Sequence, residues 1–493
     1  MPNRSSGILL PISSIPSNYG IGTFGREAYN FIDFLKCSGQ TYWQLLPMGS
    51  VSYGDSPYSS FSLYAGNPLY IDLDFLIEEG ILSFQDCKCL LLDEENINYE
   101  KQFNYRYKIL YKAYLCSKDK YYREIEEFRS NNYWTLEYSL FMALKYHFNQ
   151  LPWYLWHEKI AMRSMEKLEY YKELLTEEIQ YWSYLQYLFY KQYFNLKKYA
   201  NTQGINIIGD LPIYAAEDSV EAWANRDVFV TDENNLISMV AGVPPDAFSD
   251  AGQLWGNPVY NWEYLKNTSY EWWINRLKWN FKLYDVIRID HFRGFDEFWA
   301  VPGGSQNAIN GKWIRAYGKA MFNQALKELD GLNIIAEDLG IITDSVRELR
   351  DYFNFPGMKV LQFAFDGSLD NPYLPNNYEK NSVAYTGTHD NDTLKGWFSK
   401  LETDAKLYVL STLDIELDIE ADKILDQIIE RVLVSKANIA IIPLQDYLYL
   451  GSNARINTPA TLGNNWSWRV KKELLNGELA GKIRKMTEIS ERV

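Results

Sequence analysis

The chain has 493 residues, of which 47% are hydrophobic and 23% are charged, a composition typical of a folded protein with a large core rather than a disordered one. Its formal net charge of −15 argues against a nucleic-acid partner, because proteins that bind the phosphate backbone present basic surfaces. No apolar run approaches the length of about 18 residues that a membrane span needs, and the first residues do not resemble a secretion signal, so we predict a cytoplasmic protein.

The four cysteines do not form a metal-binding pattern. They are Cys37, Cys87, Cys89 and Cys116. Cys87 and Cys89 are separated by one residue rather than the usual two, and no histidine lies near them. We therefore expect reduced thiols, and we see no segment that indicates a protein partner.

The chain begins with a predicted strand–helix–strand unit. Gly7–Leu10 is a short apolar run closed by Pro11, and we interpret it as the first strand. Arg26–Ser38 has helical periodicity, and Tyr42–Leu46 is predicted as the second strand. Such a unit indicates parallel strands with a helix between them.

Long segments then interrupt the strand pattern. Residues 54–68 form a polar and aromatic loop, and residues 75–200, rich in Glu, Lys, Tyr and Leu, are predicted as a helical insertion between the second and third strands. We predict a smaller insertion at 211–284, containing an aromatic loop at 242–258. Loops as long as 54–68 inside a domain are usually functional or disordered, and the aromatic residues there argue against disorder.

Six further strands are predicted along the chain, and the helix Tyr270–Tyr284 precedes the second of them. They are Ile205–Gly209, Val286–Asp290, Leu332–Ala336, Val360–Ala364, Ser382–Thr386 and Asn438–Ile442. Eight strands separated by helical stretches predict one catalytic domain, residues 1–493, folded as a closed (β/α)8 barrel of the TIM type with insertions. No G-x-G-x-x-G follows an early strand, so a dinucleotide-binding sheet is unsupported.

Three acidic residues fall at the predicted strand ends where a barrel of this type carries its active site. Asp290 ends the fourth strand, Glu337 follows the fifth, and Asp390 lies just after the seventh. Any one of them alone would more simply be a surface residue or half of a buried ion pair. Retaining glycosidases need two carboxyl groups about 5–5.5 Å apart, which neighbouring strands could provide.

The surroundings of each acid predict its role. Arg288 shares a strand face with Asp290 and would favour the ionised form that a nucleophile needs. Glu337 follows an apolar run, and burial would raise its pKa and suit it to donate a proton. Asp390, beside His389, could bind sugar hydroxyls.

A divalent metal site is the alternative use of acids and histidines at a barrel mouth. Arg288 and Arg293 lie beside Asp290 in the sequence, and their positive charges would repel a cation. We therefore predict a site without a metal.

A series of motifs follows in one order along nearly the whole chain. They are Tyr42-Trp-Gln-Leu-Leu-Pro47, Gly54-Asp-Ser-Pro-Tyr-Ser59, Gly209-Asp-Leu-Pro-Ile-Tyr214, Gly242-Val-Pro-Pro-Asp246, Gly252-Gln253 with Trp255-Gly-Asn-Pro258, Arg288-Ile-Asp-His-Phe-Arg-Gly294, Ala336-Glu-Asp-Leu-Gly340, Gly387-Thr-His-Asp-Asn391, and Asn464-Asn-Trp466 with Trp468-Arg469. In content and order they resemble the 4-α-glucanotransferases called amylomaltase or disproportionating enzyme, which form glycoside hydrolase family 77 in the α-amylase clan.

The resemblance implies a role for each matching residue. Asp290 would be the nucleophile, Glu337 the acid/base and Asp390 the transition-state stabiliser. The residues implied to lie beside these acids or to bind the glucan are Arg288, His291, His389, Tyr58, Asp210, Phe248, Trp255 and Asn465. The implied substrates are maltooligosaccharides, α-1,4-glucans and glucose, with no metal or organic cofactor.

The sequence departs from the family pattern at two loop positions. Ala460 stands where the family usually has glycine, and Ala247 precedes Phe248 where some relatives carry a second aromatic residue. These departures concern the shape of one loop and the rim of the glucan site.

Two alternative functions share much of this pattern. An α-amylase-like hydrolase would use the same three acids with water as the acceptor, and only the family resemblance favours transfer over it. A non-catalytic glucan-binding protein is the other alternative, and it would not need to keep all three acids.

Overall fold

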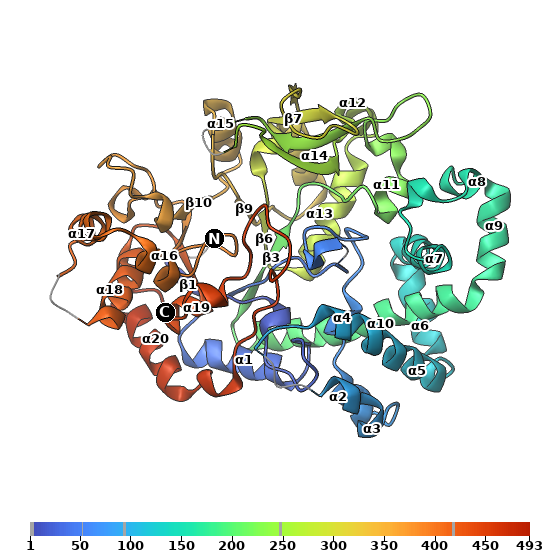
Figure 1. The fold of residues 1–493 in the computed structure, drawn as a ribbon, viewed down its shortest axis with the longest axis horizontal. Coiled ribbons are helices and arrows are strands. Elements are labelled where there is room, and N and C mark those ends of the chain that lie inside the picture. Colours follow the sequence, from blue (N-terminus) through green and yellow to red (C-terminus); the bar gives the residue numbers. More distant parts are fainter. Residues whose placement is uncertain (1–3, 52, 92–94, 246–248, 417–419) are drawn as a thin grey trace.

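The centre of the molecule is a closed barrel of eight parallel strands (Figure 1). We analysed a computed structural model of the chain, which describes residues 4–51, 53–91, 95–245, 249–416 and 420–493. The barrel strands are β1 (Ser5–Leu9), β2 (Tyr42–Gln44), β3 (Asn206–Leu211), β6 (Val286–Ile289), β9 (Ile334–Ala336), β10 (Gly357–Val360), β11 (Ser382–Tyr385) and β12 (Ile439–Pro443). They follow one another around the barrel in chain order, and β12 pairs with β1. The predicted (β/α)8 barrel is confirmed.

The barrel strands are short, and each is buried along nearly its whole length. The segments are rich in isoleucine and valine, as in Val286–Ile289, where every residue is buried. Strands covered on both faces read as continuous apolar runs rather than as alternating patterns. This is the signal that made the strands visible in the sequence.

Helices surround the barrel on its outer side (Figure 1). Those that connect or follow barrel strands are α1 (Arg26–Cys37), α13 (Glu271–Leu283), α14 (Gly318–Glu328), α15 (Asp344–Tyr352), α16 (Leu394–Lys400), α17 (Thr403–Thr412), α18 (Ala421–Val434), α19 (Leu444–Tyr447) and α20 (Gly477–Ile489). The predicted helices at 26–38 and 270–284 are confirmed as α1 and α13, within one residue at each end.

A group of helices lies to one side of the barrel, between β2 and β3 in the chain (Figure 1). They are α2 (Leu73–Glu78), α3 (Phe84–Cys87), α4 (Tyr99–Lys101), α5 (Tyr107–Ser117), α6 (Tyr122–Asn131), α7 (Trp134–His147), α8 (Glu158–Ala161), α9 (Met165–Leu174) and α10 (Thr176–Thr202). Helix α10 packs against α7, where Trp182 lies beside Tyr138 and Tyr190 beside Trp134. It packs against α1 where Tyr199 lies beside Tyr29. Many aromatic residues of this region are therefore part of the core, although others, such as Tyr122 and Tyr133, are exposed. The division of the region into subdomains stays a prediction.

A second sheet corrects the prediction of a loop at 242–258. Four antiparallel strands lie in the order β5 (Gln253–Pro258), β4 (Met239–Val243), β7 (Glu297–Pro302) and β8 (Lys312–Arg315). Strand β5 has no strand signal in the sequence, because it contains Gly256 and Pro258 and its first residues are exposed. Its strand form depends on pairing with β4, which is itself paired to β7. Two short helices, α11 (Val220–Ala224) and α12 (Trp262–Asn267), flank this region.

The prediction of the sixth strand was also wrong in its position. We predicted 360–364, but β10 spans Gly357–Val360, and Leu361–Phe363 form a 3-10 turn. The apolar run continues past the strand end because Leu361 remains fully buried. Hydrophobicity alone cannot locate where such a strand stops.

A buried arginine closes the base of the barrel. The side chain of Arg492 is fully buried, and its guanidinium donates hydrogen bonds to backbone carbonyls of Ser5 (3.0 Å), Asn438 (3.2 Å), Ser435 (3.1 Å) and Ala437 (2.8 Å), as well as to the Leu433 carbonyl. These carbonyls belong to β1, to the last turn of α18 and to the segment that leads from α18 into β12. One side chain therefore joins the first strand to the segment that enters the last strand.

We expect Arg492→Ala to destabilise the fold by about 3 kcal/mol or more, because it leaves several buried carbonyls without donors. A fall in the thermal unfolding midpoint, measured by circular dichroism, would check this. The matched control is Lys485→Ala, an exposed residue of α20 whose replacement should change stability by no more than about 0.5 kcal/mol. Equal midpoints for the two variants would contradict the role given to Arg492.

Two other sequence predictions bear on the whole chain. None of the four cysteines is in a disulfide in the structure, and their reduced state stays a prediction. Within the described ranges, no helix combines the length and the apolar character needed to cross a bilayer. The cytoplasmic location stays a prediction.

Candidate active site

The predicted nucleophile and acid/base lie next to each other at the carboxyl ends of neighbouring strands. Strands β6 and β9 pair in parallel with Ile289 opposite Ala336, so Asp290 and Glu337 are the next residues in register. The backbone N–H of Glu337 donates to the Ile289 carbonyl at 3.0 Å. The two carboxyl groups therefore share one side of the barrel mouth, as the sequence predicted.

An ion-pair network holds Asp290 in place. Arg288 Nη1 donates to Asp290 Oδ1 at 3.0 Å and to both carboxylate oxygens of Asp210, at 2.7 and 2.8 Å. Strand register places Asp210 directly opposite Arg288 on β3. Asp290 keeps 31% of its side chain exposed, and its Oδ2 has no hydrogen-bond partner among the described residues. A carboxylate fixed by one oxygen and free at the other suits a nucleophile.

Asp210 lies below the surface of the site. Its side chain is 0% exposed, and its oxygens accept hydrogen bonds from Arg288 and from the Tyr58 hydroxyl, the latter at 2.8 Å. Burial raises the pKa of Asp210, and the positive charge of Arg288 opposes that rise. Because Asp210 is buried and its oxygens are hydrogen-bonded to Arg288 and Tyr58, we infer that it orients these two side chains. Its predicted contact with sugar stays a prediction.

Glu337 is held by two backbone donors. The N–H of His291 donates to Oε2 at 2.7 Å, and the N–H of Leu339 donates to Oε1 at 3.1 Å. His291 adopts a left-handed conformation with φ of 51°, immediately before the 3-10 turn Phe292–Phe295. Burial, followed by the charge of Asp290, raises the pKa of Glu337 to about 8. The group can therefore hold a proton at neutral pH, as a general acid must.

His291 links the acids to the small sheet. Burial, assisted by the charge of Arg293, lowers the pKa of His291 to about 4, so the imidazole is neutral near pH 7. Its ring packs edge-on against Trp255 of β5, with centroids 4.8 Å apart. Trp255 is 38% exposed, which leaves ring surface for a sugar.

Three aromatic rings form a second wall of the site. Tyr58 stacks on His389, with centroids 5.2 Å apart and planes 19° apart, and Trp466 lies 5.8 Å from each of them. Trp466 belongs to a motif noted in the sequence, but no role was predicted for it. Asn465, the predicted glucan contact beside it, accepts a hydrogen bond from the Thr458 N–H at 2.9 Å and so orders the loop.

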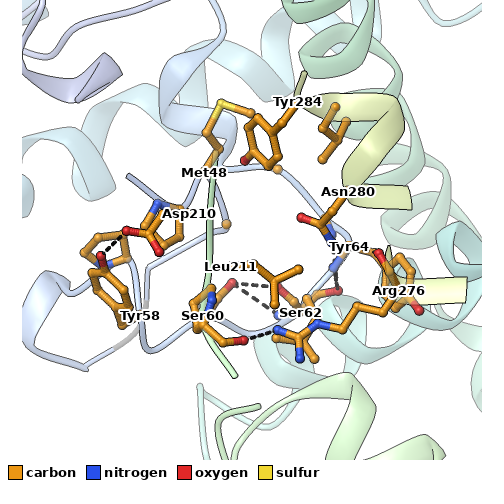
Figure 2. A pocket seen from close by; sticks show the side chains of 18 of the residues that line it. Met48, Tyr58, Ser60, Ser62, Tyr64, Asp210, Leu211, Arg276, Asn280 and Tyr284 are labelled. Atoms are coloured by element: carbon orange, nitrogen blue, oxygen red, sulfur yellow. Dashed lines mark hydrogen bonds between the residues drawn. The ribbon is translucent and has the colours of Figure 1, made fainter. Parts of the chain in front are cut away.

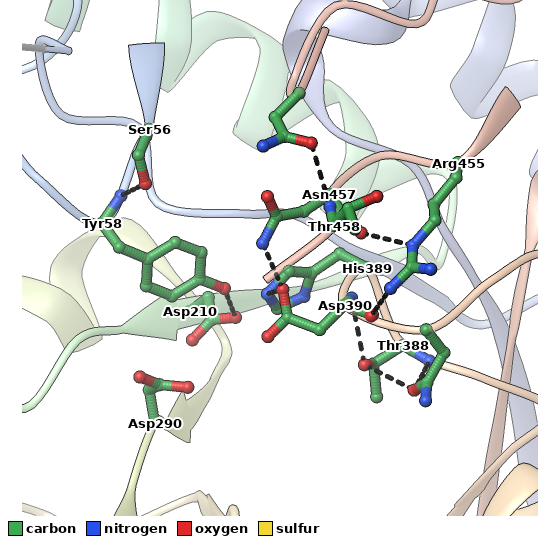
Figure 3. A network of polar contacts seen from close by, with 12 residues as sticks. Ser56, Tyr58, Asp210, Asp290, Thr388, His389, Asp390, Arg455, Asn457 and Thr458 are labelled. Carbon is green, nitrogen blue, oxygen red and sulfur yellow. Dashed lines mark hydrogen bonds and ion pairs between the residues drawn. The ribbon is translucent and has the colours of Figure 1, made fainter. Parts of the chain in front are cut away.

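Asp390 lies on the loop after β11 and is 48% exposed (Figure 3). Its Oδ1 accepts a hydrogen bond from Asn457 Nδ2 at 2.6 Å and lies 3.4 Å from His389 Nε2. Arg455 donates to the backbone carbonyl of Asp390 at 2.5 Å. Sequence reasoning missed Arg455 and Asn457, because they follow β12 and reach Asp390 only once the barrel places β12 beside β11.

A pocket lies behind the ion-pair network, between β3 and α13. Figure 2 shows Tyr58 and Asp210 on one side of it and Tyr64, Arg276 and Asn280 on the other. The loop that carries Tyr58 runs along this pocket.

Buried Glu221 of α11 anchors the loop. It accepts hydrogen bonds from Ser62 Oγ (2.9 Å) and the Leu63 N–H (3.0 Å), and burial raises the pKa of Glu221 to about 7. No sequence motif pointed to Glu221, because its partners come from a loop far earlier in the chain.

Two predictions concern bound ligands: the glucan contact of Phe248 and the absence of a metal. Phe248, predicted to contact the glucan, lies outside the described residues. Among the described residues no group of three or more histidine, cysteine, aspartate or glutamate side chains is placed to hold a metal ion.

The family model and the relatives that match this chain carry the same description. The model of the family described as 4-alpha-glucanotransferase, glycoside hydrolase family 77, matches residues 10–475. The 4-alpha-glucanotransferase of Clostridium butyricum is 49% identical over 97% of this chain and 99% of its own length. That of Thermus thermophilus is 42% identical, with 99% of each chain covered.

A solved structure is similar throughout. Amylomaltase from Streptococcus agalactiae in complex with acarbose is 40% identical and superimposes with a TM-score of 0.96 over 99% of both chains. Amylomaltase from Corynebacterium glutamicum, at 19% identity and a TM-score of 0.81, shares the fold over 98% of this chain and 75% of its own.

Proposed function

The chain belongs to the 4-alpha-glucanotransferases of glycoside hydrolase family 77, and from that membership we propose how Asp290, Glu337 and Asp390 carry the transfer reaction. The substrates are α-1,4-glucans and maltooligosaccharides as donors, with maltooligosaccharides or glucose as acceptors. The observation that supports this best is the geometry of the two acids: Asp290 and Glu337 are consecutive in register on paired strands, one held by a guanidinium and the other by backbone N–H groups.

In the first step Asp290 attacks the anomeric carbon of the donor. Its free Oδ2 forms the new bond, while Arg288 keeps Oδ1 in place. Glu337 donates its proton to the glycosidic oxygen as the bond to the leaving chain breaks. The shortened glucan departs, and a covalent glycosyl–enzyme remains with inverted configuration.

In the second step the 4-hydroxyl of an acceptor sugar attacks the same carbon. Glu337, now ionised, takes the hydroxyl proton, and Asp290 leaves as a carboxylate. Two inversions return the α configuration. Asp390 holds sugar hydroxyls while positive charge develops on the ring, and its half-exposed position on the barrel mouth suits that contact.

Transfer requires that a sugar reach the intermediate before water does. The aromatic surfaces of Trp255 on one side and of Tyr58 with Trp466 on the other offer sugar rings apolar faces to stack on. A bound acceptor also displaces water from the anomeric carbon. We propose that these rings favour transfer over hydrolysis.

Incubation with maltotriose alone tests the proposal. We expect glucose and longer maltooligosaccharides to appear at a constant total of reducing ends, because each transfer breaks one glycosidic bond and forms another. Chain lengths measured by chromatography and reducing ends measured in the same samples give both quantities.

The alternatives predict different products from the same incubation. A steady rise in reducing ends with only shorter products would identify a hydrolase. Unchanged maltotriose would identify a glucan-binding protein without activity. Either result would overturn the proposed reaction.

A further inference from the structure

Asn457 contacts the loop of Asp390 through two separate groups (Figure 3). Its side-chain Nδ2 donates to Asp390 Oδ1 at 2.6 Å, and its backbone N–H donates to the carbonyl of His389 at 3.1 Å. The side-chain contact is the shortest hydrogen bond that Asp390 makes through its carboxylate. It is made by a residue 67 positions away in the chain.

Arg455 completes the contact from the same segment. Its Nη2 donates to the backbone carbonyl of Asp390 at 2.5 Å, and its Nε donates to the carbonyl of Asn457 at 2.6 Å. Arg455 therefore fixes the peptide of Asp390 and the peptide of Asn457 relative to each other. The segment that follows β12 therefore donates hydrogen bonds to both the main chain and the side chain of Asp390.

The carboxylate needs such support because of where it lies. Asp390 follows the end of β11 on a loop, and 48% of its side chain is exposed, whereas Asp290 is 31% exposed and tied to buried Arg288. An exposed side chain samples several rotamers unless a partner selects one. A stabilising carboxylate that is displaced by about 1 Å loses much of its effect on a transition state.

We propose that Asn457 is the positioning residue that holds the Asp390 carboxylate in the orientation needed for transition-state stabilisation. This inference rests on the role proposed above for Asp390. Asn457 acts through Asp390 and is not itself a catalytic residue. An amide suits the task, because it donates a hydrogen bond without adding a charge beside the carboxylate.

Several charged or titratable groups surround the contact, and they bear on its test. His389 lies on the same loop, and Arg455 lies on the segment after β12. The facing side of the site contributes Tyr58, Arg288, Asp210 and Asp290. These groups stay the same when only residue 457 is replaced. A change in pH dependence between variants at this position therefore originates at residue 457 and the groups coupled to it.

Asn457→Ala should lower kcat for maltotriose disproportionation by about 10- to 100-fold, with KM changed by less than about 3-fold. Asn457→Asp has the same size and keeps the backbone contact to His389. It places a second carboxylate beside Asp390, and two carboxylates at this separation cannot both be ionised without strong repulsion. We expect low activity at pH 7 that rises as the pH is lowered towards about 5, where one shared proton restores the hydrogen bond.

The recovery at low pH is the readout that a merely structural role would not produce. The matched control is Asn453→Asp, which adds the same charge at an exposed position of the same segment and should keep the wild-type profile. If Asn457→Ala fails to fold, as judged by its thermal midpoint, the isosteric variant Asn457→Asp still tests whether residue 457 positions Asp390. Wild-type kcat and an unchanged pH profile in Asn457→Asp would overturn the inference.

Asp390→Ala separates this inference from the proposal on which it rests. An active Asp390→Ala enzyme would remove Asp390 from the mechanism, and the role of Asn457 with it. An inactive Asp390→Ala enzyme beside normal Asn457 variants would overturn only the role of Asn457. In the Asp390→Ala background, adding Asn457→Ala should cause no further loss, because the contact is already gone.

Discussion

Asp290→Asn should lower the rate of maltotriose disproportionation by about 10⁴-fold or more, because an amide cannot form the glycosyl–enzyme bond. The fold should survive. Arg288 keeps its two contacts to Asp210 in the variant, so no buried charge is left without a partner. Glucose release from maltotriose measures the loss, and the thermal midpoint measures the fold.

The matched control flanks the same strand at its other end. Asp285 immediately precedes β6 and accepts a hydrogen bond from the Ile207 N–H at 2.7 Å, at the amino end of the barrel. Asp285→Asn makes the same chemical change away from the barrel mouth and should leave activity within about 3-fold of wild type. Wild-type turnover in Asp290→Asn would remove this residue from the nucleophile role.

Glu337→Gln should lower kcat/KM for maltotriose by about 10³-fold, because a glutamine cannot donate a proton to the glycosidic oxygen. The loss should be much smaller with α-maltosyl fluoride as the donor, since fluoride leaves without protonation. The ratio of the two losses, measured with the same acceptor, reports on proton donation specifically. Equal losses with both donors would contradict a general-acid role.

The pH profile of the wild-type enzyme provides the control for this role. Burial and Asp290 raise the pKa of Glu337 to about 8, so the protonated form is present below that pH and is lost as the pH rises through it. Since the free enzyme must hold the proton, kcat/KM for maltotriose should fall above about pH 8. In Glu337→Gln this fall should disappear, and a persistent fall would assign it to another group.

Sequence reasoning located the barrel and the acids for one physical reason. Buried parallel strands are short apolar runs, and residues at their carboxyl ends must meet at one face of a closed barrel. Asp290 and Glu337 could therefore be placed together without any knowledge of the loops. The raised pKa of Glu337 also followed from the apolar run before it.

What could not be predicted depends on contacts between distant segments. Strand β5 has no strand signal of its own and forms by pairing with β4. The contact of Asn457 with Asp390 could not be predicted, because the two residues are far apart in the sequence and meet only in the closed barrel. Asp210 was predicted from resemblance as a sugar contact, but its burial beneath Tyr58 is a property of the packed structure.

Closure of the barrel between β1 and β12 also has a consequence for how the protein is made. Ser5 pairs with Ile439, so β1 can pair with β12 only after nearly the whole chain has been synthesised. At translation rates of about 5–20 residues per second this interval is on the order of tens of seconds. During that time an apolar strand edge stays unpaired, and such edges promote aggregation. Efficient production of the enzyme should therefore depend on chaperones that bind the nascent chain.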